Sequence, residues 1–145
     1  MNPLVRRYLK TGVLFLATGL GLGFWMLVAR EFGSATPPRL RSAHTHALLV
    51  GFVMMMISGV ALWMFPRVRP DDARYKPALA EAAWWCIAPG TAVRVVLEVV
   101  LTADASMAAR TTVVVAGAAQ VLGLMLFFWT MWPRIRAAGA NSGGR

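Results

Sequence analysis

Long, uncharged and mostly apolar runs dominate the pattern of the chain. Three are clear: Thr11 to Ala29, Ser42 to Phe65 and Thr111 to Trp132. A fourth run, Ala82 to Leu101, is equally apolar but contains Arg94 and Glu98. Since about 20 apolar residues cross the ~30 Å hydrocarbon core of a bilayer, each run is long enough to span a membrane. The pattern predicts four helices, over about residues 8–29, 42–65, 80–102 and 110–133.

Short connections join these runs, and the longest covers Pro66 to Glu81. Neighbouring helices must therefore run antiparallel and pack as a compact bundle. We predict an all-α fold with a single four-helix membrane domain over residues 1–136. The tail, residues 137–145, is small and polar, and we expect it to be disordered.

Composition and charge exclude a water-soluble globule. Of the 145 residues, 58% are hydrophobic and 14% charged, which is too apolar for a soluble domain of this size. The net charge of +9 comes from Lys and Arg along the predicted membrane edges, which favours contact with membrane lipid and not with nucleic acid. Ten of these cations lie on the side of both termini and four on the other side. The positive-inside rule then predicts cytoplasmic N- and C-termini in the inner membrane.

Four ionisable side chains lie in one layer near the outer ends of two helices. His44 and His46 fall ~4–7 Å below the outer end of the second helix, at 1.5 Å per residue. Glu98 and Arg94 fall ~4 and ~10 Å below the same side of the third helix. Ionisable groups in a membrane usually face a partner or a cavity, so this layer is the candidate functional site. The simpler interpretations are an i, i+4 ion pair between Arg94 and Glu98, and ordinary interfacial histidines.

The spacing of the two histidines limits what they can bind. Residues i and i+2 of an α-helix are about 200° apart, so the imidazoles of His44 and His46 point to nearly opposite sides. They cannot both ligate one metal ion from an ideal helix. A single imidazole suffices as an axial haem ligand, because the porphyrin supplies four nitrogens. A bare metal ion would need further ligands, such as Glu98 or residues of a second protomer.

One segment resembles the second transmembrane helix of subunit I in the haem-copper oxidase superfamily. It runs from Leu40 to Phe52, LRSAHTHALLVGF, and continues to Pro66 and Arg67. The cbb-type oxidases and nitric oxide reductases are the most similar. The resemblance implies that His44 is an axial ligand of a low-spin haem b. The superfamily's second axial His and its further active-site His residues are missing from this chain. We therefore do not expect a complete oxidase or reductase from this chain alone.

These observations lead to one main hypothesis, a small membrane protein that holds haem b through His44 near the extracytoplasmic side. It would serve respiratory or denitrification electron transfer, or the handling of nitric oxide or oxygen. Arg41, Arg39 and Arg94 are the candidate partners of the haem propionates, and Glu98 is expected to orient an imidazole or Arg94. The sixth position of the iron would be filled by His44 or His46 of a second protomer, by a Met or by nothing, and a homo-oligomer with the haem near its interface would resolve the shortage of ligands. A respiratory or denitrification protein is a further expected partner.

Two alternatives belong to other classes of protein. In the first, copper or zinc is bound by His44, His46 and Glu98 across protomers. In the second, the chain is a cofactor-free accessory subunit of a respiratory complex, and its polar groups only fix helix contacts. No nucleophile with an adjacent base, phosphate-binding loop or carboxylate pair indicates catalysis in the sequence.

Overall fold

The computed structural model describes residues 2–65, 77–101 and 105–135. Its elements are α1 (Pro3–Glu31), α2 (Leu40–His46), the π-helix η1 (Ala47–Met54), α3 (Met55–Met64), α4 (Pro77–Val100), α5 (Met107–Met131) and the short 3-10 helix η2 (Trp132–Arg134). Because α2, η1 and α3 follow one another without a break, they form one helix from Leu40 to Met64, which we call the second span. The predicted disordered tail lies outside the described residues.

The prediction of an all-α fold with four membrane-spanning helices is confirmed. Four helices are long and apolar enough to cross a membrane, and the described residues contain no strand. The first of them begins at Pro3, earlier than the apolar run, because the side chain of Asn2 accepts a hydrogen bond from Leu4 N and caps the helix. The cytoplasmic location of the termini stays a prediction.

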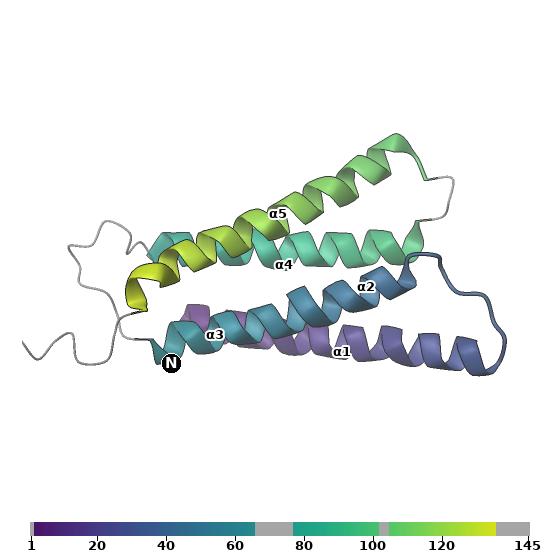
Figure 1. Ribbon diagram of the computed structural model, residues 1–145, viewed down its shortest axis with the longest axis horizontal. Helices are drawn as coiled ribbons and strands as arrows, with labels where there is room; N and C mark the ends of the chain where they lie inside the picture. Colours follow the sequence, from purple (N-terminus) through teal and green to yellow (C-terminus); the bar gives the residue numbers. More distant parts are fainter. Residues whose placement is uncertain (1, 66–76, 102–104, 136–145) are drawn as a thin grey trace, which may run out of the picture.

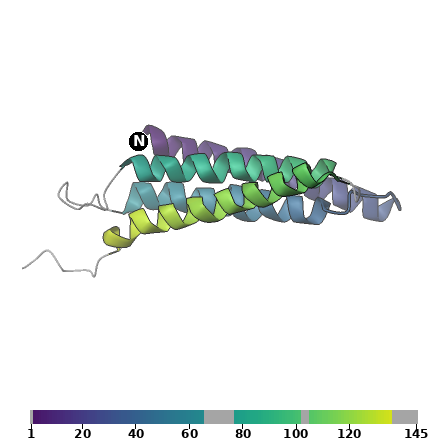
Figure 2. The same cartoon turned by 90° about the horizontal axis from the view of Figure 1, so that it is seen from above.

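The four long helices form two antiparallel hairpins (Figure 1). In the first hairpin α1 packs along the second span, and in the other α4 packs along α5. Helix α4 joins the hairpins, because it also contacts α2 and η1, and both views show it beside the first hairpin (Figures 1 and 2). Helix α5 contacts the first hairpin mainly through α3, whereas α2 and η1 of the second span contact α4.

Glycines set the spacing between α1 and the second span. At each of five levels along this contact, which we call the glycine seam, a glycine on one helix lies against a larger side chain of the other. The pairs are Gly59 with Leu9, Gly12 with Met56, Gly51 with Phe15, Gly19 with Leu48 and Gly23 with His44. A missing Cβ lets two helices approach closely in a membrane. The seam therefore fixes the register that brings His44 opposite Gly23.

The π-helix keeps one face of the second span against its neighbours. Ala43, Ala47, Gly51 and Met55 are all buried and follow one another at intervals of four residues. In a regular α-helix of 3.6 residues per turn such a row drifts around the axis, whereas the wider turns of a π-helix reduce that drift. Ala43 and Ala47 consequently reach Val95 of α4 in one buried cluster.

The core at the other end, where α1 begins, is closed by Tyr8. This side chain is completely buried, lies beside Phe127 and donates a hydrogen bond of 2.8 Å to the carbonyl of Ala80. We expect Tyr8→Phe to lower the free energy of unfolding by about 0.5–1.5 kcal/mol, the net value of one such bond. Unfolding in a detergent titration measures this change, and an unaltered stability would contradict the assigned bond.

Candidate functional site

The imidazole of His44 is held against α1. Its Nδ1 lies 2.9 Å from the carbonyl oxygen of Gly19. Because a carbonyl oxygen only accepts, Nδ1 carries the hydrogen of this bond, and in the neutral imidazole Nε2 then keeps a lone pair. A methyl group added to Gly23 would lie 2.8 Å from Cε1 of the ring. Gly19 and Gly23 thus form a slot that fixes both the position and the tautomer of His44.

The imidazole of His46 faces a different helix. Its Nδ1 lies 2.8 Å from the carbonyl oxygen of Ser42 and 3.6 Å from Oε2 of Glu98, which belongs to α4. The prediction that the two imidazoles point to different sides of the helix is therefore confirmed. Of the three residues proposed for a copper or zinc site, the chain brings His46 and Glu98 together and turns His44 toward α1.

Glu98 is the centre of a polar network inside the membrane-spanning region. It is only 4% exposed, and its Oε1 accepts a hydrogen bond of 3.0 Å from Nε of Arg94. Its Oε2 has no hydrogen-bond partner among the described residues. Because the carboxylate and the guanidinium neutralise each other, the pair lowers the cost of burying either charge. The i, i+4 ion pair of the simpler interpretation is present, and Glu98 also adjoins His46.

Two further residues extend this network to α5. Nη1 of Arg94 donates to Oε1 of Gln120 at 3.2 Å, and the Gln120 amide donates to the hydroxyl of Thr91 at 2.9 Å. Both Gln120 and Thr91 are buried. Our sequence analysis missed them, although an amide in the middle of an apolar run is a signal of such a contact.

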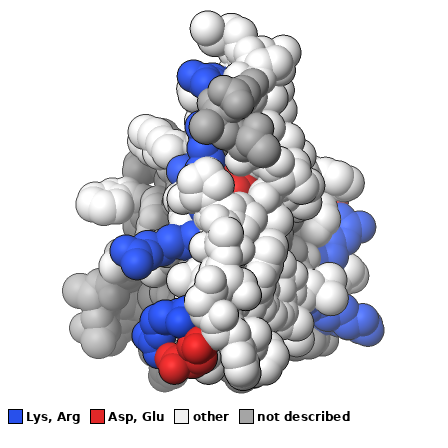
Figure 3. Space-filling model, turned by 90° about the vertical axis from the view of Figure 1, so that its right-hand side faces the viewer, with Lys and Arg blue, Asp and Glu red and all other residues white. Residues whose placement is uncertain are grey.

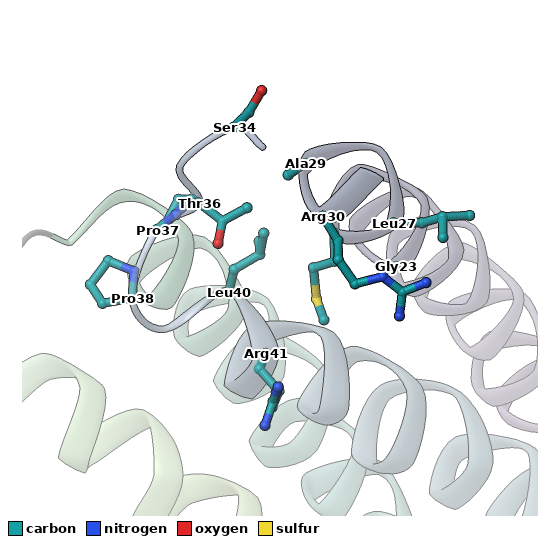
Figure 4. A pocket seen from close by; sticks show the side chains of 11 residues that line it. Gly23, Leu27, Ala29, Arg30, Ser34, Thr36, Pro37, Pro38, Leu40 and Arg41 are labelled. Carbon is teal, nitrogen blue, oxygen red and sulfur yellow. The ribbon is translucent and has the colours of Figure 1, made fainter. Parts of the chain in front are cut away.

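A pocket of about 660 Å³ opens beside the His44 slot, between the end of α1, the connection that follows it and the start of α2 (Figure 4). It is lined by Gly23, Met26, Leu27, Ala29, Arg30, Ser34, Thr36, Pro37, Pro38, Leu40 and Arg41. Gly23 belongs both to the pocket and to the slot. Arg41, which the sequence analysis named as a candidate propionate partner, lines this pocket. Arg30 was missed, although it directly follows the first apolar run.

The other two predicted propionate partners do not line this pocket. Arg39 is half-buried at the residue before α2, and Arg94 is bound to Glu98 and Gln120. Figure 3 shows basic side chains spread over the face at this end of the bundle. Within the described ranges no group of three or more His, Cys, Asp or Glu side chains is placed to hold a metal ion.

Comparison with known proteins gives one finding. Neither the curated proteins nor the solved structures contain a match. The family model for cytochrome c and quinol oxidase polypeptide I matches residues 3–141, nearly the whole chain. Together with four apolar helices, this match identifies a multi-pass membrane protein related to the haem-copper oxidases. The chain belongs to the cytochrome c and quinol oxidase polypeptide I family.

Proposed function

We propose that this protein binds haem b through Nε2 of His44 and transfers electrons in a respiratory or denitrification chain. The observation that carries the proposal is the hydrogen bond from His44 Nδ1 to the carbonyl of Gly19. A metal-ligating histidine commonly donates its other N–H to a carbonyl or carboxylate, which fixes the ring and makes the free nitrogen a better ligand. The family match supports the same cofactor.

A pocket adjoins the His44 slot at Gly23, and His44 itself is not among its lining residues. Its volume of about 660 Å³ lies within the range of about 300–1,000 Å³ that is usual for sites of small ligands and cofactors. The lining is about half apolar and half polar, and Arg30 and Arg41 would provide two guanidinium groups for the propionates. Arg39 and Arg94 stay predictions as propionate partners.

A non-covalently bound haem fits the cysteine content. The sequence has a single Cys, at position 86, so it lacks the C-x-x-C-H arrangement through which a c-type haem is attached. When bound, a haem iron takes up and releases single electrons, and the protein sets its potential through the axial ligands and the polarity of the pocket. In this chain His44 would hold the iron, and the two arginines would neutralise the propionates.

The remaining parts of the proposal concern location and assembly. The excess of Lys and Arg on the side of the termini supports an inner-membrane protein whose His44 layer is near the extracytoplasmic surface. A homo-oligomer and a respiratory partner stay predictions. The separation of 3.6 Å between His46 and Glu98 is the observation in favour of copper or zinc as the alternative guest, which would need ligands from a second protomer.

An absorption spectrum tests the proposal directly. We expect the purified protein to show a Soret band that shifts on reduction, and we expect His44→Ala to remove it because the iron loses its protein ligand. His46→Ala is the matched control, since that ring faces α4, and it should keep the band. Absence of the band from the wild-type protein, or its persistence in His44→Ala, would overturn the proposal.

A further inference from the structure

We infer that the pocket at the end of α1 binds the headgroup of an anionic phospholipid, and that the acyl chain of this lipid lies along an exposed face of α1. The inference goes beyond the proposed function and does not rest on it. It follows from the charge of the pocket, from the level of the pocket along the helices and from its continuity with an apolar surface.

Two arginines line the pocket from two different helices. Arg30 belongs to the last turn of α1 and Arg41 to the first turn of α2, and Ser34 and Thr36 of the connection add two hydroxyl groups (Figure 4). Among the residues that the structure describes, Arg41 has no hydrogen-bond or ion-pair partner. Arg30 donates from Nε and Nη2 to Oε1 of Glu31, at 3.0 and 2.9 Å, which leaves its Nη1 for a ligand. Because two guanidinium groups outweigh one carboxylate, the site favours an anion such as a phosphate diester.

The pocket lies at the level where a bilayer has its headgroups. The apolar run of α1 ends at Ala29, and the next apolar run begins at Ser42. Both helices are long and apolar enough to cross a membrane. Since the polar headgroup region directly follows the hydrocarbon core, the segment between these two residues lies beside the lipid phosphates.

An apolar surface leads away from the pocket along α1. Leu20, Phe24 and Leu27 follow one another at intervals of four and three residues, so they lie on one face of the helix. All three are exposed, and Leu27 also lines the pocket. The row covers a rise of about 10 Å, along which an acyl chain can pack. A free phosphate would use the pocket alone, whereas a phospholipid uses the pocket and the row.

The charges of the pocket select the type of lipid. Phosphatidylglycerol presents a phosphate and hydroxyl groups, whereas phosphatidylcholine also brings a quaternary ammonium group, which the two arginines repel. The propionates of a haem would need the same arginines, Arg30 and Arg41. A lipid phosphate and the propionates therefore exclude each other, and we place the lipid in the protein without haem.

The experiment titrates the whole chain, as apoprotein in detergent, with phosphatidylglycerol or phosphatidylcholine and follows the bound lipid by native mass spectrometry. We expect phosphatidylglycerol to bind at least tenfold more tightly. Arg30→Gln and Arg41→Gln should each weaken its binding about fivefold, the effect of one arginine near a membrane surface. Arg6→Gln is the matched control, because Arg6 is exposed at the other end of α1, and it should leave the preference unchanged.

A phosphatidylglycerol with a photoreactive group in its acyl chain tests the path of the chain. It should label the row of Leu20, Phe24 and Leu27, and an excess of inorganic phosphate should not remove the label. Equal affinities for the two lipids, arginine variants without effect, a label elsewhere or displacement by inorganic phosphate would overturn the inference.

The two proposals fail separately. A protein that prefers phosphatidylglycerol but has no Soret band would overturn haem binding and leave the lipid site in place. A protein with the Soret band but without a lipid preference would overturn the lipid site alone.

Discussion

Glu98→Leu is expected to lower the free energy of unfolding by about 2–3 kcal/mol, because it leaves the charge of Arg94 without its carboxylate inside the membrane-spanning region. The hydrogen bond of 3.0 Å from Arg94 to Glu98 would be lost, and only the amide oxygen of Gln120 would still accept from the guanidinium. A detergent titration that follows helix content or tryptophan fluorescence measures the change. The large effect comes from the unpaired charge and not from the bond itself.

The chain contains a matched control for this experiment. Arg7 and Glu81 form an ion pair of 2.7 Å, but both side chains are half-exposed, so Glu81→Leu should change the stability by about 0–1 kcal/mol. The double variant Arg94→Leu, Glu98→Leu should recover much of the loss, because a well-packed apolar pair removes both charges. Equal effects of Glu98→Leu and Glu81→Leu, or a double variant less stable than either single one, would contradict the role assigned to the buried pair.

Gly23→Ala is expected to weaken haem binding at least tenfold, which corresponds to about 1.4 kcal/mol of binding free energy. The added methyl group would lie 2.8 Å from Cε1 of His44, so either the ring or the helix must move. Since Nδ1 is fixed by the Gly19 carbonyl at 2.9 Å, movement of the ring breaks the bond that sets its tautomer. Titration of the apoprotein with haem measures the affinity.

Gly21→Ala provides the comparison, because a methyl group at Gly21 meets no atom within 4 Å. This variant should bind haem like the wild type, and alanine should favour the helix by up to about 1 kcal/mol. If both alanine variants bind haem equally well, the slot formed by Gly19 and Gly23 does not position the ligand.

The number and placement of the helices could be predicted from the sequence, because a membrane span needs a long apolar run and little else. Counting 1.5 Å of rise per residue also placed Glu98 and His46 at similar depths, and Nδ1 of His46 lies 3.6 Å from Oε2 of Glu98. The helical rotation between positions i and i+2 also predicted correctly that His44 and His46 face different neighbours. These predictions were correct because they depend only on the geometry of a single helix and on the fact that helices joined by short connections run antiparallel.

The lining of the site could not be predicted in the same way. Which residues meet across two helices depends on their register, and the glycine seam sets that register through contacts far apart in sequence. Arg30 and Met26 enter the pocket because the connection after α1 folds back against the start of α2. The hydrogen bonds of Gln120 likewise depend on how α5 lies on α4. The pattern of apolar runs along the sequence does not show which residues of two helices meet.

The division of the bundle into two hairpins has a mechanical consequence. The imidazole of His44 and its glycine slot belong entirely to the first hairpin, whereas Glu98, Arg94 and Gln120 belong to the second. A tilt of one hairpin against the other would stretch the distance between His46 and Glu98 but would carry the His44 slot along as a rigid unit. Changes in bilayer thickness that act on α5 would therefore leave the ligand geometry of the first hairpin undisturbed.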